Sequence, residues 1–196
     1  MYQLVTGHDS EERRGQWDQK FNKSEYVYGT EPALFLRENI AKLPVGRVLD
    51  IAMSEGRNAV FLAKKGFNVE GVDFSEVALR KAKKLAHEQH VSIATINADL
   101  SHYKIKENSY DVILNIDFLL RGLVPEIKKG LKKGGVVVFE NFTVDQLKNP
   151  DGQGTSRDWL LNKGELKEMF KDFEILVWHE TNDGKRAVAS LIARKL

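Results

Sequence analysis

The sequence contains no cysteine, which excludes disulfide bonds, cysteine-ligated metal sites and thiol nucleophiles. Acidic and basic side chains nearly balance, so the formal net charge of +2 is too small for general electrostatic capture of nucleic acid. No stretch approaches the roughly 20 apolar residues of a membrane-spanning helix, and the first fifteen residues, MYQLVTGHDSEERRG, lack the apolar core of a signal peptide. We therefore expect a soluble, cytoplasmic protein that binds neither nucleic acid nor a membrane.

The chain has enough apolar residues for one buried core. With 196 residues, of which 42% are hydrophobic, it has room for a single globular domain and little room for a second. Residues 1–44 are polar with helical spacing of their apolar positions, and Asp9 is a candidate helix cap. We expect residues 1–44 to form an N-terminal helical cover and residues 45–196 to form the main domain.

From Gly46 onward, short β-rich runs alternate with helical periods, which predicts an α/β fold. The expected sheet is doubly wound, mostly parallel and seven-stranded, with helices on both faces. The Asp-Gly pair in NDGK (182–185) favours a tight hairpin, so one strand should be antiparallel. The strands are expected at 47–52, 67–73, 91–98, 110–116, 135–142, 173–181 and 186–195, and the helices from Gly56 and at 75–90, 123–133 and 163–170.

Acidic residues follow the first three expected strands. Asp50 ends the first strand, Asp73 ends the second and Asp99 follows the third. Ligands of open parallel sheets bind beyond the carboxyl ends of the strands, and the 23-residue step from Asp50 to Asp73 is typical of a carboxylate that binds ribose hydroxyls. Taken singly, each Asp is equally well explained as a loop or helix cap.

The corner after the first strand reads AMSEG (52–56). Ala52 and Ser54 stand where a nucleotide-binding loop has glycines, and Glu55 makes the loop a poor cradle for a phosphate. A cofactor with a ribose, a base and a cation but no phosphate would suit it, and S-adenosylmethionine fits that description. Because the neighbouring motifs are intact, we expect the backbone at Ala52 and Ser54 to avoid positive φ.

The segment VLDIAMSEGRNAVFLAKKGFNVEGVDFSEVAL (48–79) resembles the first motifs of class I S-adenosylmethionine-dependent methyltransferases, in particular the tellurite-resistance-type and thiopurine-methyltransferase-like branch. Weaker similarity extends to 17–36, 149–170 and 186–195. The resemblance implies a Rossmann-like methyltransferase domain over 45–196 and S-adenosyl-L-methionine as the cofactor.

The resemblance also implies a set of site residues. Asp73 becomes the ribose ligand, Asp99 and Leu100 meet the adenine edge, and Asn115 faces the methionine part. Phe118 and Arg121, together with Tyr28, are candidates for lining an acceptor pocket, although such residues are more often packing or surface positions. The cofactor-binding candidates are Tyr28, Asp50, Ala52, Met53, Ser54, Gly56, Asn58, Asp73, Phe74, Ser75, Asp99, Leu100 and Asn115.

The implied activity is methyl transfer to a small-molecule acceptor, a soft sulfur, selenium or tellurium nucleophile or an oxygen nucleophile. The segment NIDF (115–118) lacks the two prolines of amino-group methyltransferases, which argues against a nitrogen acceptor. One alternative is a noncatalytic S-adenosylmethionine-binding or regulatory protein. Another is a nicotinamide-dependent oxidoreductase, which the missing G-x-G-x-x-G disfavours. The sequence identifies neither a catalytic side chain nor an oligomeric state.

Several remaining features have simpler interpretations. The basic clusters at 80–84 and 128–133 are expected to be solvated helix faces, and His87 and His90 an exposed helix face without a metal. The connection 143–162 is too long for a routine loop, so we expect a lid or disorder. We also expect 24–32 and 149–159 to cover the site, with Tyr28 touching the cofactor or acceptor and Trp159 packed beneath its loop.

Overall fold

The computed structural model describes residues 10–196, so the candidate cap Asp9 lies outside the described residues. A helical N-terminal part precedes the sheet, with α1 (Ser10–Phe21), α2 (Leu34–Asn39) and the 3-10 turn η1 (Ile40–Lys42). The strands are β1 (Arg47–Ile51), β2 (Asn68–Asp73), β3 (Ala94–Asn97), β4 (Tyr110–Ile116), β5 (Leu131–Phe142), β6 (Glu174–Asn182) and β7 (Ala187–Arg194). The remaining helices are α3 (Arg57–Lys64), α4 (Glu76–Glu88), α5 (Val124–Gly130) and α6 (Glu165–Met169), and the short 3-10 turns are η2 (Arg121–Leu123), η3 (Val144–Lys148), η4 (Pro150–Gly152) and η5 (Arg157–Trp159).

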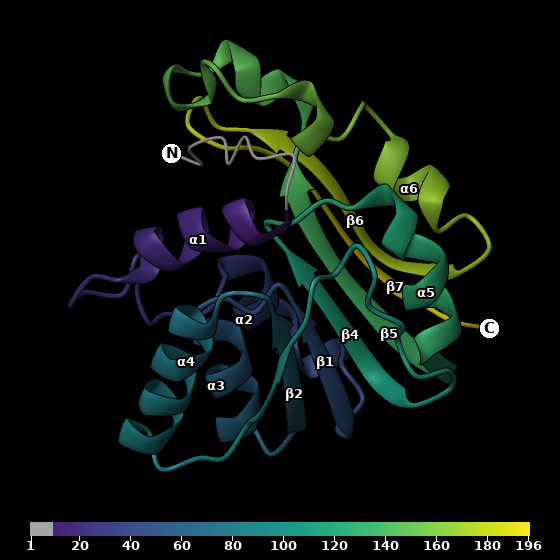
Figure 1. The fold of residues 1–196 in the computed structure, drawn as a ribbon. Helices are drawn as coiled ribbons and strands as arrows, with labels where there is room; N and C mark the ends of the chain where they lie inside the picture. Colours follow the sequence, from purple (N-terminus) through teal and green to yellow (C-terminus); the bar gives the residue numbers. More distant parts are fainter. Residues whose placement is uncertain (1–9) are drawn as a thin grey trace.

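The predicted sheet is confirmed. Its seven strands have the order β3-β2-β1-β4-β5-β7-β6, and β7 is antiparallel to both of its neighbours while the other pairs are parallel. The strand order reverses between β1 and β4, which makes the carboxyl ends of these two strands the switch point of the sheet. In Figure 1, α1 lies across the end of the sheet at which β1 and β2 finish.

Each face of the sheet is covered by its own layer of helices (Figure 1). In β4, Val112 and Leu114 pack with residues of α2, α3 and α4, whereas Ile113, between them, packs with residues of α5 and α6. All three side chains are fully buried. A central parallel strand therefore reads as a continuous apolar run, because both of its faces are inside the protein.

The expected helix over 123–133 is shorter than the pattern suggested. It ends at Gly130, and the chain enters β5 at Leu131, which is fully buried and paired with Tyr110. A Cβ on Gly130 would lie 2.4 Å from the side chain of Ile105, so only glycine permits this close approach. Tertiary packing thus ends the helix although the lysines that follow are good helix formers.

The connection 143–162 is ordered by its own contacts and contains three 3-10 turns, η3, η4 and η5. Gln146 accepts the backbone N–H of Ala187 at 2.7 Å and donates to the carbonyl of Lys185 at 2.9 Å, which fastens the segment to the β6–β7 hairpin. The prediction that Trp159 packs beneath the loop is wrong, since Trp159 is 38% exposed while Leu160 and Leu161 take the interior positions.

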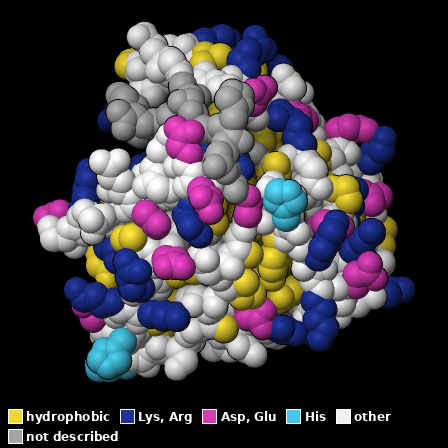
Figure 2. All heavy atoms as spheres, viewed as in Figure 1, with side chains coloured by type: hydrophobic (Ala, Val, Ile, Leu, Met, Phe, Trp, Pro, Cys, Tyr) yellow, Lys and Arg dark blue, Asp and Glu magenta, His cyan; other side chains and the backbone are white. Residues whose placement is uncertain are grey.

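Within residues 10–196, no helix combines the length and the apolar character needed to cross a bilayer. The same part of the chain contains no group of three His, Cys, Asp or Glu side chains placed to hold a metal ion. On the face drawn in Figure 2, Lys and Arg side chains are interspersed with Asp and Glu side chains.

Candidate functional site

The corner between β1 and α3 adopts a left-handed backbone at alternate residues. Ala52, Ser54 and Gly56 have φ values of 52°, 55° and 85°. The expectation that Ala52 and Ser54 avoid positive φ is therefore wrong. Between them, the N–H of Met53 donates to the carbonyl of Val72 at 3.1 Å, so the loop is tied to the end of β2.

Two glycines make room for this corner. A Cβ on Gly71 would lie 2.0 Å from the sulfur of Met53, and a Cβ on Gly56 would lie 2.7 Å from the Cβ of Ala82 in α4. Gly56 is required for a second reason, because its φ lies in the left-handed region. The buried Met53 side chain, 4% exposed, thus fixes the alternating conformation of the residues on either side of it.

Asp73 ends β2 directly beside this loop. Its carboxylate accepts the N–H of Ser54 at 2.9 Å and the N–H of Ser75 at 2.9 Å. Burial raises the pKa of Asp73 to about 6, although these two backbone hydrogen bonds favour the charged form. The Ser75 hydroxyl caps α4 by accepting the N–H of Ala78 at 3.1 Å, and it donates to Asp18 of α1 at 2.6 Å.

Several buried oxygens at this end of the sheet have no hydrogen-bond partner among the described residues. They are Asp50 Oδ2 at the end of β1, Asn115 Oδ1 at the end of β4, Ser54 Oγ and Asp99 Oδ2. The Asn115 amide nitrogen donates to the carbonyl of Phe118 at 2.9 Å, so only the amide oxygen lacks a partner. Burial raises the pKa of Asp50 to about 8. An unsatisfied buried polar group costs about 1–3 kcal/mol, so this edge would gain from a ligand that supplies hydrogen-bond donors.

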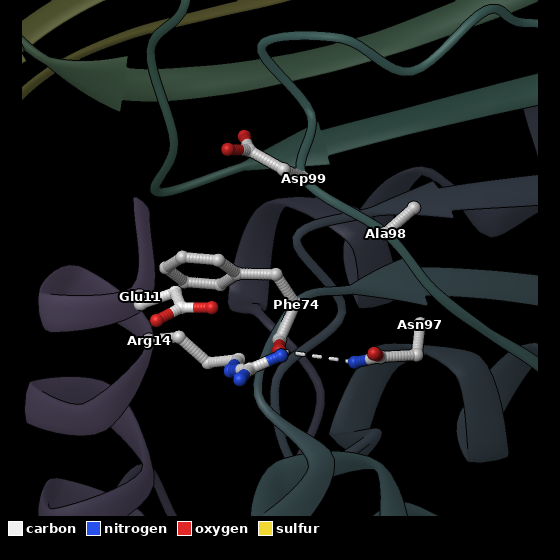
Figure 3. A pocket seen from close by; sticks show the side chains of 6 residues that line it. All are labelled: Glu11, Arg14, Phe74, Asn97, Ala98 and Asp99. Carbon is white, nitrogen blue, oxygen red and sulfur yellow. Dashed lines mark hydrogen bonds between the residues drawn. The ribbon is translucent and has the colours of Figure 1, made fainter. Parts of the chain in front are cut away.

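A hollow of about 90 Å³ opens between α1 and the ends of β2 and β3 (Figure 3). Phe74, Asn97, Ala98 and Asp99 line one side, and Glu11 and Arg14 reach in from α1. The amide of Asn97 donates to the carbonyl of Phe74 at 3.0 Å. Partial burial opposes ionisation of Asp99, but hydrogen bonds from Ser101 hold its pKa below the usual value. Leu100, which follows, is 8% exposed and belongs to the core.

Tyr28 lies on the other side of the corner. Its hydroxyl accepts a hydrogen bond from Lys20 Nζ at 2.8 Å, and its ring packs edge-on against Phe21 at a centroid distance of 6.1 Å. Burial and then the nearby charge of Asp117 raise the pKa of Tyr28. The phenol is therefore protonated at neutral pH.

A charged network follows β4, and sequence reasoning missed it. Asp117, with φ of 58°, lies 3.2 Å from Arg57 of α3 and 3.2 Å from Arg186 of the β6–β7 hairpin. Arg186 also pairs with Glu140 at 3.3 Å, and Glu140 accepts the Ser190 hydroxyl at 2.6 Å. These residues lie far apart in the sequence, and no local sequence motif indicates that they form a network. Phe118 is half-buried beside this network and packs on the α5–α6 face of the core.

Two predicted site residues, Arg121 and Asn58, make structural contacts. The guanidinium of Arg121 bonds Glu165 at 2.6 Å and the carbonyls of Asp158 and Leu160 at 2.9 Å, so it clamps the end of the connection 143–162. The side-chain oxygen of Asn58 accepts the N–H of Ala33 at 2.8 Å and thereby anchors the start of α2. The cofactor role of Asn58 and the acceptor role of Arg121 stay predictions.

The basic cluster 80–84 contains a half-buried lysine, Lys81, which corrects the expectation of a solvated face. The Lys81 side chain is 14% exposed and lies 2.5 Å from the carboxylate of Glu55, which is itself 2% exposed. Glu55 belongs to the corner loop, where its acidic side chain seemed out of place. The signal that could have found the pair is the buried-side spacing of α4, which places Lys81 beside Ala78 and Ala82.

Comparisons with known proteins agree with this geometry. Residues 48–135 match the profile of a family described as a methyltransferase domain. The chain is 29% identical over 164 residues to a protein of Haemophilus influenzae described as a probable S-adenosyl-L-methionine-dependent methyltransferase, TehB, and the match covers 76% of this chain and 57% of TehB. The chain thus spans little more than half the length of this relative.

Solved structures show the same fold. The crystal structure of TehB from Haemophilus influenzae superposes with a TM-score of 0.68 at 24% identity, covering 83% of this chain and 61% of that one. The magnesium protoporphyrin IX methyltransferase from Synechocystis, solved with bound S-adenosylhomocysteine, superposes with a TM-score of 0.65 at 17% identity, covering 97% and 90%. The resemblance expected from the corner loop is thereby confirmed: the chain carries a methyltransferase-domain match and is similar to the tellurite-resistance-type branch of the class I S-adenosylmethionine-dependent methyltransferases.

Proposed function

We propose that this protein transfers a methyl group from S-adenosyl-L-methionine to a small-molecule acceptor. The observation that carries the proposal is the set of buried acceptor oxygens at the switch point, on Asp50, Asn115 and Ser54, which lack partners among the described residues. A cofactor with an ammonium group, ribose hydroxyls and a sulfonium charge supplies the donors and the positive charge that such oxygens need.

Different residues at this edge of the sheet bind different parts of the cofactor. Asp73 binds the ribose hydroxyls, and Phe74, Ser75, Asp99 and Leu100 surround the adenine. Asp50, Ser54 and Asn115 face the methionine part, and the backbone of Ala52, Met53 and Gly56 forms the wall of the site. The bound cofactor supplies an electrophilic methyl carbon and a neutral thioether as the leaving group. The protein's own contribution is to orient donor and acceptor and to exclude water.

The protonation of Tyr28 bears on the kind of acceptor. Its raised pKa makes the phenol a hydrogen-bond donor and a poor general base at neutral pH. An acceptor that arrives as a nucleophilic anion, such as a thiolate, a selenium or tellurium oxyanion or an acidic oxygen, needs no proton removed. Two arginines, Arg57 and Arg186, pair with Asp117, whose charge acts on the Tyr28 phenol.

The two parts of the chain have different roles in this proposal. Residues 1–44 act as a helical cover and residues 45–196 as the methyltransferase domain. Contacts in support are the hydrogen bond from Ser75 to Asp18 of α1 and the ion pair of Arg13 with Asp99 at 3.7 Å, which hold α1 over the end of the sheet.

The test is product formation. The purified protein is incubated with S-adenosylmethionine and, separately, with methanethiol, selenite, tellurite or a phenol, and S-adenosylhomocysteine is measured by mass spectrometry. We expect acceptor-dependent S-adenosylhomocysteine that disappears in Asp73→Ala. Cofactor binding with no turnover on any acceptor would favour the noncatalytic alternative, and binding of a nicotinamide cofactor instead would favour the oxidoreductase.

A further inference from the structure

Glu55 is a buried carboxylate inside the cofactor loop, between the left-handed residues Ser54 and Gly56. Its carboxylate contacts the N-terminal segment and α4. One oxygen accepts the N–H of Val27 at 2.7 Å and the N–H of Tyr28 at 3.4 Å, while the other lies 2.5 Å from Lys81 Nζ. The loop expected to hold the cofactor is therefore also the anchor of the chain that carries Tyr28.

Lys81 completes the anchor from α4. Its ammonium group donates to the carbonyls of Glu25 at 2.6 Å, Lys23 at 3.1 Å and Phe21 at 3.4 Å. The same ammonium lies 5.0 Å from the centre of the Tyr26 ring. The ammonium of Lys81 thus binds carbonyl groups at the end of α1 and in the irregular segment between α1 and α2. The carboxylate of Glu55 balances its charge.

The geometry connects the two halves of the site. Ser54, next to Glu55, donates its N–H to Asp73, the proposed ribose ligand. Tyr28, whose N–H bonds Glu55, lies close enough to Asp117 and Asp73 for their charges to act on its hydroxyl. A change in the Glu55–Lys81 pair would therefore alter the position of the loop beside Asp73 and the position of Tyr28.

We infer that Glu55 and Lys81 are positioning residues for methyl transfer: the pair fastens residues 21–28 across the cofactor loop and fixes Tyr28 over the site. The inference rests on the proposed function. Neither side chain touches the reacting atoms, and both act through the backbone of the segments that they join. The buried carboxylate of Glu55 needs the half-buried ammonium of Lys81, because leaving a buried charge without its partner is strongly destabilising.

The experiment compares four variants with the wild type. Lys81→Met removes the charge and keeps the length of the side chain, Lys81→Arg keeps the charge, and Glu55→Gln keeps the shape of the carboxylate. Lys84→Met is the matched control, since Lys84 lies on the same helix with 68% of its side chain exposed. Three quantities are measured: hydrogen exchange of residues 21–29 without cofactor, the Kd for S-adenosylhomocysteine, and the Tm.

We expect Lys81→Met to raise exchange across 21–29 and the Kd by about tenfold each, Lys81→Arg to restore most of both, and Lys84→Met to match the wild type. A lower Tm in Lys81→Met with exchange and Kd within twofold of the wild type would overturn the inference, because the pair would then be merely structural. If Lys81→Met does not fold, the same two criteria apply to Glu55→Gln. Failure of the wild type to bind S-adenosylhomocysteine would overturn the proposed function alone, since the exchange result is obtained without cofactor.

Discussion

Replacing Ala52 and Ser54 by glycine tests the conformation of the cofactor loop. Both residues have φ near +50°, a region that costs a non-glycine residue about 1–2 kcal/mol. Glycine relieves this cost, but two effects oppose the relief. Glycine has greater freedom in the unfolded chain, which destabilises the folded state by about 0.4–1 kcal/mol per site, and the contact of the Ala52 methyl group with the core is lost in part. The Ser54 hydroxyl is buried without a partner among residues 10–196, so its removal costs little. We expect the double variant to be more stable by about 1 kcal/mol.

The assay is urea unfolding followed by circular dichroism, with a second readout of cofactor affinity. A gain of 1 kcal/mol corresponds to a rise in Tm of about 2–4 °C for a chain of this size. The positive φ values belong to the folded loop itself, so glycine at these positions relieves strain of the folded state. Because Ser54→Gly also removes one of the oxygens proposed to face the methionine part, the Kd for S-adenosylhomocysteine should rise by up to about tenfold, the equivalent of one hydrogen bond of about 0.5–1.5 kcal/mol.

Ala63→Gly is the matched control, because Ala63 is half-buried and lies inside α3 with helical geometry. It should lower the free energy of unfolding by about 0.5–1 kcal/mol. If the double variant loses stability as the control does, the backbone at positions 52 and 54 is not left-handed in solution and the reasoning fails.

Further predictions concern the carboxylates and the clamp of the long connection. Asp73→Asn should raise the Kd for S-adenosylhomocysteine at least tenfold by calorimetry, because the charge opposite the ribose hydroxyls is lost; an unchanged Kd in a folded variant would remove Asp73 from the site. Burial raises the pKa of Asp50 to about 8 from an unfolded value near 4, so the folded state holds the extra proton and stability should fall as pH rises from about 4 to 8. In urea unfolding at pH 5 to 8, Asp50→Asn should reduce the pH dependence of the free energy of unfolding by at most about 1.4 kcal/mol per pH unit. Equal slopes in the variant and the wild type would contradict a raised pKa of Asp50. Arg121→Ala should speed proteolytic cleavage within 143–162 and cost about 1 kcal/mol, since the clamp is partly exposed; unchanged cleavage would mean that Arg121 does not hold the connection.

The sequence was sufficient to predict the sheet and its acidic edge. Parallel strands buried on both faces are continuous apolar runs, and the acidic residues at their carboxyl ends fall into register because each βαβ unit has a similar length. Asp50 and Asp73 therefore lie beside the same loop in the structure, as expected.

The left-handed backbone conformation at Ala52 and Ser54 could not be predicted from the local sequence. Ala52 and Ser54 are poor residues for positive φ, and local preference argues against the conformation that they adopt. Tertiary contacts decide the outcome, because the Met53 side chain fills the space above Gly71 and the Met53 N–H bonds Val72. Neither contact is visible in a window of five residues.

Long-range ion pairs were missed for a related reason. Lys81 belongs to a basic run that looks like a solvated face, and its partner Glu55 lies 26 residues earlier in a loop. Arg57, Asp117 and Arg186 likewise come from separate elements that only the fold brings together. The contacts of Arg121 with the carbonyls of Asp158 and Leu160 were likewise invisible in the sequence, because those residues lie 37 and 39 positions away.

The central claim is that the switch point of this sheet binds S-adenosylmethionine, and native mass spectrometry tests it most directly. The purified wild-type protein is mixed with equimolar S-adenosylhomocysteine and NAD, with Asp73→Asn as the control. We predict a 1:1 complex with S-adenosylhomocysteine in the wild type and its marked reduction in the variant. A wild-type protein that captures NAD, or neither molecule, would contradict the account.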